Sequence, residues 1–285
     1  MINNWVFCLV TSLFFVVIFH QFYKLSTQTA KKDGAMTILL QFIGGLSILI
    51  WLPLFPIQFP TDIKVYGLLT IACVFYAVND RLQTTARKHL QVSLFSIVNQ
   101  LSNVFLILIG LTVFREPFLI SKILGAGFIL FANVFLVYDG GKLKINKYIW
   151  VVVAANFAFA VAISTDIGIS KYFNLPFYVA FTLIVPAIII FLVEKITIKE
   201  IADEYKRGVK KYLYVTGFAW SLCILFALRA YQLGKITVIV PLQGTSVLIT
   251  IIISYLFLHE RSNLIKKIIA ALLVFIGVYL TVQGF

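Results

Sequence analysis

Long apolar runs, separated by short clusters of charged residues, are the feature that most restricts how this chain can fold. A helix needs about 20 apolar residues to cross the roughly 30 Å hydrocarbon core of a bilayer. Ten runs of about this length lie between the charged clusters, at residues 3–22, 34–55, 65–85, 92–114, 119–138, 148–167, 177–193, 212–233, 236–258 and 265–282. We therefore predict an all-α integral membrane protein with ten transmembrane helices.

The composition agrees with a lipid environment. Of the 285 residues, 61% are hydrophobic and only 12% are charged, which is too little polar surface to cover a soluble core of this size. The apolar runs are continuous rather than alternating, which favours helices. Cys8, Cys73 and Cys223 fall singly within these runs, so we expect neither a disulfide framework nor a metal site, and no cofactor.

The net charge of +13 would suggest a nucleic-acid partner in a soluble protein, but the distribution of the charge favours another explanation. Of the 24 Lys and Arg residues, 18 fall in the odd-numbered connections when Arg81 is assigned to the third. This bias predicts a multi-pass protein of the cell membrane with its odd-numbered connections in the cytoplasm and both termini outside. The expected partners are the lipid bilayer and a small-molecule substrate, with no nucleic acid; a monomer and a homodimer are both compatible.

The longest connection, residues 194–211, carries apolar residues at helical spacing. They are Ile198, Ile201, Ala202, Tyr205 and Val209. An amphipathic helix lying on the headgroups and a solvated basic loop are both open interpretations.

An internal repeat appears when the second half is placed on the first with an offset of 144 residues. Identical residues then coincide at Ala86 and Ala230, Ser102 and Ser246, Ile107 and Ile251, Glu116 and Glu260, Lys122 and Lys266, Ala126 and Ala270, Phe131 and Phe275, and Val134 and Val278. Because five helices cross the membrane an odd number of times, the second unit is upside down relative to the first. The sequence thus predicts two inverted five-helix repeats, residues 1–141 and 142–285, with a substrate site at the midplane between them.

Short motifs at the ends of the fourth and ninth runs carry a resemblance to a known family. These are Phe114-Arg115-Glu116-Pro117 and Leu258-His259-Glu260-Arg261, followed by the small residues Gly125-Ala126-Gly127 and Ala270-Ala271. With ten helices in two fives, the chain resembles the drug/metabolite transporter superfamily, EamA type. The resemblance implies a secondary transporter with a central cavity, in a family that carries amino acids, sugars, nucleotide sugars and other metabolites. Its ten-helix members are usually drawn with cytoplasmic termini, opposite to the charge bias here.

Polar side chains recur along one face of the third run. Tyr76, Asn79, Asp80, Gln83 and Arg87 follow the spacing of a helix face. Ionisable groups inside a membrane helix are costly and normally face a wet cavity or a partner. Asp80 is therefore predicted to bind a coupling proton or a substrate amine, with Asn79 and Tyr76 hydrogen-bonding beside it. The alternative is that Asp80 lies near the headgroups and pairs with basic neighbours.

A second polar stripe follows the fourth run and is expected to face the interior of the bundle. It includes Asn99 and Asn103, and the offset places Asn99 on Gln243 of the ninth run. Two symmetry-related amides are what a midplane site would contain, whereas interhelical hydrogen bonds are the structural alternative. Asn156 and Trp220 are expected to add to the lining.

Glu116 and Glu260 end the fourth and ninth runs beside basic residues. A structural ion pair or helix cap at headgroup level is preferred here over a coupling role.

The leading interpretation is a secondary transporter that exports a small polar, amino-acid-like metabolite by alternating access. A nucleotide-sugar or sugar-phosphate antiporter would need basic residues deep in the cavity, for which only Arg81 and Arg229 are candidates. A lipid-modifying membrane enzyme or a receptor is the rival of another class. We expect no enzyme, because nucleotide-binding and hydrolase motifs are missing and Asp80 has no histidine or second carboxylate in neighbouring runs.

Overall fold

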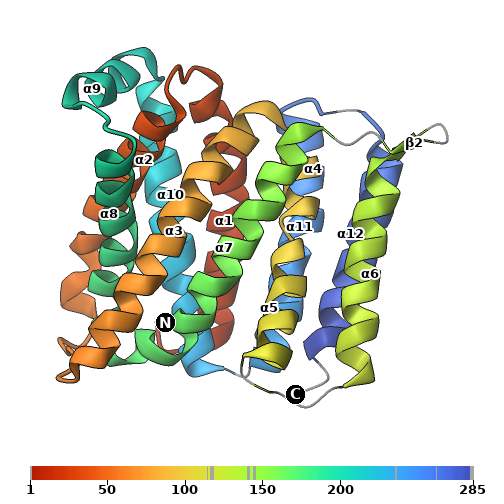
Figure 1. Cartoon of the computed structure of the whole chain (residues 1–285), viewed down its shortest axis with the longest axis horizontal. Coiled ribbons are helices and arrows are strands. Elements are labelled where there is room, and N and C mark those ends of the chain that lie inside the picture. Colours follow the sequence, from red (N-terminus) through yellow and green to blue (C-terminus); the bar gives the residue numbers. More distant parts are fainter. Residues whose placement is uncertain are drawn as a thin grey trace.

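The computed structural model describes residues 2–113, 115, 119–139, 142–143, 146–234, 236–260 and 262–282. Long helices run side by side between two ends of the molecule (Figure 1). In chain order the helices are α1 (Trp5–Gln28), α2 (Asp33–Ile48), α3 (Ile63–His89), α4 (Val92–Val98), α5 (Leu101–Thr112), α6 (Ile120–Val137), α7 (Lys147–Ile169), α8 (Leu175–Val193), α9 (Ile198–Arg207), α10 (Lys210–Leu233), α11 (Ile236–Phe257) and α12 (Leu264–Val282). The short 3-10 segments η1 (Leu49–Leu54) and η2 (Ser170–Tyr172) extend α2 and α7, and the two-residue strands β1 (Tyr138–Asp139) and β2 (Lys142–Leu143) form an antiparallel pair.

The prediction of a helical multi-pass membrane protein is confirmed. Within the described residues, eight helices are long and apolar enough to cross a membrane, with α2 and η1 counted as one span and α4 and α5 as another. Two shorter apolar helices, Ile120–Leu136 and Leu242–Phe257, fall within the fifth and ninth predicted spans.

The connections between the helices lie at two opposite ends of the molecule. The odd-numbered connections meet at the end that carries α9, which we call the α9 end, whereas α1 begins and α12 ends at the opposite end, the terminal end (Figure 1). At the α9 end, Lys24 Nζ donates to the carbonyl oxygen of Leu90 at 2.8 Å, joining the last turns of α1 to the third connection. At the terminal end, Gln58 Nε2 donates to the carbonyl oxygen of Lys171 at 2.8 Å. Most Lys and Arg residues of the connections therefore gather at the α9 end.

The long basic connection forms a helix, so its interpretation as a solvated loop is wrong. Thr197 and Glu200 make a capping box in which each side chain accepts from the backbone N–H of the other, which fixes where α9 begins. The fully buried carboxylate of Glu204 accepts hydrogen bonds from the backbone N–H groups of Lys31 and Lys32 at 3.1 and 2.9 Å. α9 is thus docked on the start of α2.

Small residues allow the closest helix contacts. A Cβ on Gly217 of α10 would lie 2.9 Å from the backbone nitrogen of Gly44 in α2, and a Cβ on Gly277 of α12 would lie 2.7 Å from the carbonyl oxygen of Gly125 in α6. Such approaches are how membrane helices gain packing energy without a hydrophobic driving force between them. Both contacts join a helix of residues 1–141 to one of residues 142–285.

Candidate functional site

A hydrogen-bonded line of polar side chains follows α3. Asn79 Nδ2 donates to Asp80 Oδ1 at 2.7 Å, and Gln83 Nε2 donates to Asn79 Oδ1 at 2.9 Å. Arg87 Nη2 then donates to Gln83 Oε1 at 3.0 Å. Four residues of the predicted face therefore form a continuous chain of contacts. We call Tyr76, Asn79, Asp80, Gln83 and Arg87 the polar column.

Asp80 is buried at the centre of the column. Its side chain is 7% exposed, and Oδ2 accepts a hydrogen bond from Gln41 Nε2 of α2 at 2.8 Å. Among the described residues, no Lys or Arg lies within ion-pair distance of it. Its donors are two neutral amides, Gln41 and Asn79, so its negative charge has no direct counter-ion. Gln41 was not singled out from the sequence because a lone glutamine in an apolar run carries little signal.

Arg87 occupies an aromatic box at the end of the column nearer the α9 end. Its guanidinium carbon lies 3.9 Å from the ring centre of Phe95, 4.8 Å from that of Tyr23 and 5.0 Å from that of Phe19. Nη1 lies 2.8 Å from His20 Nδ1. Four groups from α1 and α4 therefore surround a side chain that is only 4% exposed.

Asp166 of α7 is a functional candidate that the sequence interpretation missed. Its carboxylate is 3% exposed and accepts hydrogen bonds from the hydroxyls of Tyr76, at 2.5 Å, and Tyr178 of α8. It is the only acidic residue between Asp139 and Glu194, which is the signal that could have identified it. Because α7 packs against α3, the expectation that Asp80 has no second carboxylate in a neighbouring span is wrong.

The fourth span is interrupted where Asn99 and Gln100 separate α4 from α5. Asn156 Nδ2 of α7, which is fully buried, donates at 2.9 Å to the carbonyl oxygen of Val98, which has no helical partner at the break. The side-chain oxygens of Asn99 and Asn156 are buried and have no hydrogen-bond partner. Asn103 Nδ2 donates to Gln100 Oε1 at 3.0 Å. Thus Asn99, Asn103 and Asn156 gather at one break, in agreement with a polar interior at this level.

The remaining predicted lining residues, Trp220 and Gln243, belong to α10 and α11. Trp220 of α10 is buried and stacks against Phe19 and Tyr23, with ring centres 5.3 and 5.4 Å apart, so it shares two rings with Arg87. Gln243 of α11 accepts a hydrogen bond from the Tyr231 hydroxyl. Within the described part of the chain, Gln243 has no hydrogen bond to Asp80 or Asn99, and a single site formed by all three stays a prediction.

Glu260 is a helix cap, as preferred from the sequence. Its carboxylate accepts from the backbone N–H groups of Val92 and Ser93, at 2.7 and 3.1 Å, and from the Ser93 hydroxyl at 2.5 Å. Carboxylates stabilise helix N-termini by accepting hydrogen bonds from their free N–H groups. Glu116 lies outside the described residues.

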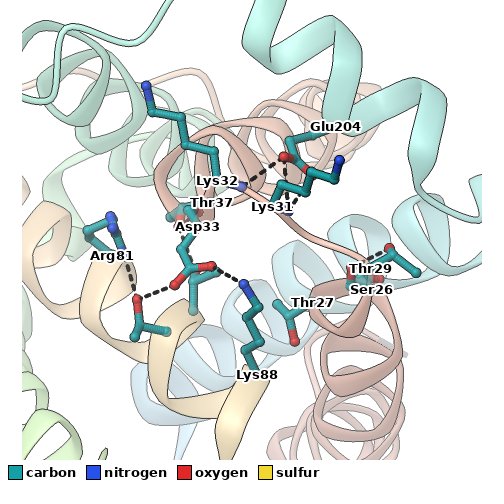
Figure 2. Close-up of polar contacts among 12 residues, drawn as sticks. Ser26, Thr27, Thr29, Lys31, Lys32, Asp33, Thr37, Arg81, Lys88 and Glu204 are labelled. Atoms are coloured by element: carbon teal, nitrogen blue, oxygen red, sulfur yellow. Dashed lines mark hydrogen bonds and ion pairs between the residues drawn. The ribbon is translucent and has the colours of Figure 1, made fainter.

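An ion-pair cluster lies beside the polar column, where α3 approaches the α9 end. Asp33 accepts from Lys88 Nζ at 3.0 Å and from Thr85 at 2.8 Å, and Arg81 donates to Thr85 at 2.6 Å (Figure 2). Arg81 also pairs with Glu194 of the connection after α8 at 2.5 Å. These contacts hold α2, α3 and the α8–α10 connection together.

One surface hollow lies away from these residues. It is a shallow, open hollow of about 640 Å³ between α6, α11 and α12, lined by Phe135, Tyr255, Asn263, Leu264, Ile265, Lys266 and Ile269. None of the predicted site residues lines it. Within the described part of the chain, no group of three or more His, Cys, Asp or Glu side chains could hold a metal ion.

Comparison with known proteins agrees with this architecture. No curated protein matches the chain. A crystal structure of a protein superposes with a TM-score of 0.57 at 12% sequence identity, covering 96% of this chain and 94% of that chain, and this similarity bears on the fold alone. Residues 146–283 match the EamA-like transporter family. This match places the second half of the chain in the EamA-like transporter family, within the drug/metabolite transporter superfamily.

Proposed function

We propose that the protein is a secondary transporter of a small polar, amino-acid-like metabolite, with the polar column of α3 as its substrate or coupling site. The observation that carries the proposal is Asp80, a buried carboxylate without a counter-ion in a membrane helix. A charge in such a place is costly and is retained where it binds a substrate, an ion or a proton. Export is the direction that we favour from the family resemblance.

Ten spans in two inverted five-helix units account for the packing of the helices. If the two units are equivalent, α1 corresponds to α7 and α3 corresponds to α10. The contact of α1 with α10 then corresponds to the contact of α7 with α3, and both are among the most extensive in the bundle. The contacts α2 with α8 and α6 with α12 map onto themselves under the same exchange. This agreement supports an inverted repeat, in which one unit rocks against the other around a central site.

The α9 end is proposed to face the cytoplasm, because it holds most Lys and Arg residues of the connections. The ion-pair cluster would then close the column from the cytoplasm. Transport requires the pairs Asp33–Lys88 and Arg81–Glu194 to separate in the opposite state.

The proposal is tested in reconstituted vesicles with solutes that first raise the melting temperature of the purified protein. Asp80→Asn should abolish the flux of such a solute per folded molecule, since the amide replaces a charged acceptor. Asp62→Asn is the matched control: Asp62 is exposed and caps the start of the same helix, where asparagine caps equally well. Flux that persists in Asp80→Asn, or chemical turnover of the solute without flux, would overturn the proposal.

The interruption of the fourth span provides a second test. Asn99→Ala and Gln243→Ala should each weaken the thermal shift given by a transported solute. If both variants respond like the wild type, the predicted midplane site between α4 and α11 is wrong, and the polar column alone remains.

A further inference from the structure

Several basic side chains near the α9 end are paired with carboxylates, whereas Arg87 has no such partner among the described residues. Lys32, Arg81, Lys88 and Arg207 each form an ion pair, with Glu200, Glu194, Asp33 and Glu204 respectively. The guanidinium of Arg87 has no described carboxylate within 4.0 Å, although it is the most deeply buried of the five.

The hydrogen-bonding capacity of Arg87 is also incomplete. Its terminal nitrogens meet one amide oxygen, of Gln83, and one ring nitrogen, of His20. The buried Nε has no partner. Aromatic rings compensate for only part of the lost hydration, because a cation–π contact contributes about 0.5 to 2 kcal/mol. A desolvated cation with an unused donor is thus left inside the bundle.

Arginine has the geometry to recognise one class of ligand. Its planar fork donates two parallel hydrogen bonds to a carboxylate or a phosphate, and it is never deprotonated at neutral pH. Gln83 and His20 fill only part of the fork, and Nε has no hydrogen-bond partner among the described residues. The rings of Phe19, Tyr23 and Phe95 hold the guanidinium plane in place.

We propose that Arg87 binds an anionic oxygen group, a carboxylate or a phosphate, of the transported solute. The inference rests on the proposed transport function and adds the chemical class of one end of the substrate. It replaces Arg81 and Arg229 as the basic candidates: Arg81 is paired with Glu194, and Arg229 contacts Asn3 at the terminal end. Asp80, seven residues earlier on the same face, lies about 10 Å away along the helix axis and is left to meet a neutral or positive part of the same solute.

Minimal anions test the binding step without knowledge of the full substrate. The melting temperature of the purified protein is measured with acetate and with inorganic phosphate, each against chloride at matched ionic strength. At least one of the two oxyanions should raise it by several degrees, since a ligand that binds only the folded state stabilises it. This shift should vanish in Arg87→Gln and persist in Lys64→Gln, which removes an exposed cation from the first turn of the same helix. No difference from chloride, or an equal shift in folded Arg87→Gln, overturns the inference.

Arg87→Lys keeps the charge and covers the case in which the glutamine variant does not fold. Because a lysine lacks the planar fork, the apparent affinity for the stabilising anion should fall about tenfold. An affinity that stays at the wild-type level would mean that Arg87 does not contact the anion.

Vesicle flux separates the two proposals. If a solute without an anionic group crosses and depends on Asp80 but not on Arg87, the inference about the anion fails and the transport function stands. If no solute crosses although phosphate or acetate binds through Arg87, the transport function fails and the anion site stands.

Discussion

α3 and α10 have the same place in the two halves of the chain and very different chemistry. The 144-residue offset superposes them, and each packs along a first helix of the other half, α3 along α7 and α10 along α1. The residues paired by the offset are Tyr76 with Trp220, Asn79 with Cys223, Asp80 with Ile224, Gln83 with Ala227 and Arg87 with Tyr231. Every ionisable or amide side chain of the polar column is therefore matched by a residue that carries no charge or amide.

Packing and chemistry therefore follow separate rules in this bundle. Helix packing needs only compatible shapes, so both halves can keep it after their sequences diverge. Buried charge is costly in a membrane and needs its own partners, which α3 finds in Gln41, His20 and Gln83. The proposed function needs only one such charged face.

The largest effect is expected from removing the carboxylate of Asp80, and the comparison is the removal of its counterpart in α10, Ile224. Asp80→Ala should lower flux per folded molecule at least tenfold, which corresponds to about 1.4 kcal/mol in the transport barrier. Ile224→Ala should lower the melting temperature, because it removes packed methyl groups, and leave the flux per folded molecule at the wild-type level. If both variants lose flux equally, the chemical asymmetry between α3 and α10 has no functional meaning.

The close approach of α10 to α2 offers the next test. The offset pairs Gly217 with Cys73 of α3, and Gly217→Cys would give α10 the residue that α3 carries. The new Cβ would meet the backbone of Gly44 at 2.9 Å, and the two helices would have to separate. We expect a loss of about 3 kcal/mol in the free energy of unfolding, at the upper end of the cost of overpacking. Cys73→Ala should cost less, and the reverse order would show that α3, not α10, has the tighter contact.

The helices and their membrane character could be predicted from the sequence because hydropathy and length alone decide them in lipid. The polar face of α3 was equally accessible, since five polar residues at helical spacing in an apolar run form a periodic signal. Asp166 and Gln41 gave no periodic signal. Asp166 is marked in the sequence only as the single acidic residue between Asp139 and Glu194, and the contacts with Tyr76 and Asp80 show what the two side chains do.

The interruption of the fourth span could also not be predicted from the sequence. Neither glycine nor proline stands at Asn99 and Gln100, and the break is stabilised by Asn156, which is 57 residues away from Asn99 in the chain. Likewise, the role of Glu204 depends on the backbone of Lys31 and Lys32, which approach it only in the folded protein. Long-range partners of this kind are set by the fold and not by local periodicity.

A smaller effect is expected at Tyr76 and Trp220, the aromatic residues that the offset pairs. Tyr76→Phe removes a hydroxyl that donates to the buried carboxylate of Asp166 and should cost about 2 kcal/mol of unfolding free energy. Trp220→Phe keeps an aromatic ring between Phe19 and Tyr23 and should cost less than about 1.5 kcal/mol. Thermal unfolding in detergent measures both. A larger loss in the tryptophan variant would mean that the position in α10 does more than pack.

The smallest effect concerns α9, which lies in the connection from α8 to α10. The corresponding connection from α2 to α3, residues 55–62, contains no helix. The hydrogen bond from Lys32 at 2.6 Å, aided by the backbone and hydroxyl of Thr197, lowers the pKa of Glu200 to about 2. Because the unfolded pKa of a glutamate is about 4.3, this contribution to stability is present above pH 4.3 and is lost as the pH falls toward 2.

The difference in melting temperature between the wild type and Glu200→Gln should therefore shrink when the pH is lowered from 6 to about 3. It should stay small throughout, since the pair is exposed and screened by salt. Lys32→Gln serves as the partner control, because in its background Glu200→Gln loses the pH-dependent contribution that comes from the pair. A difference that grows on acidification would show that α9 is held by Glu204 alone, and that the contact between Lys32 and Glu200 does not distinguish this connection from its counterpart between α2 and α3.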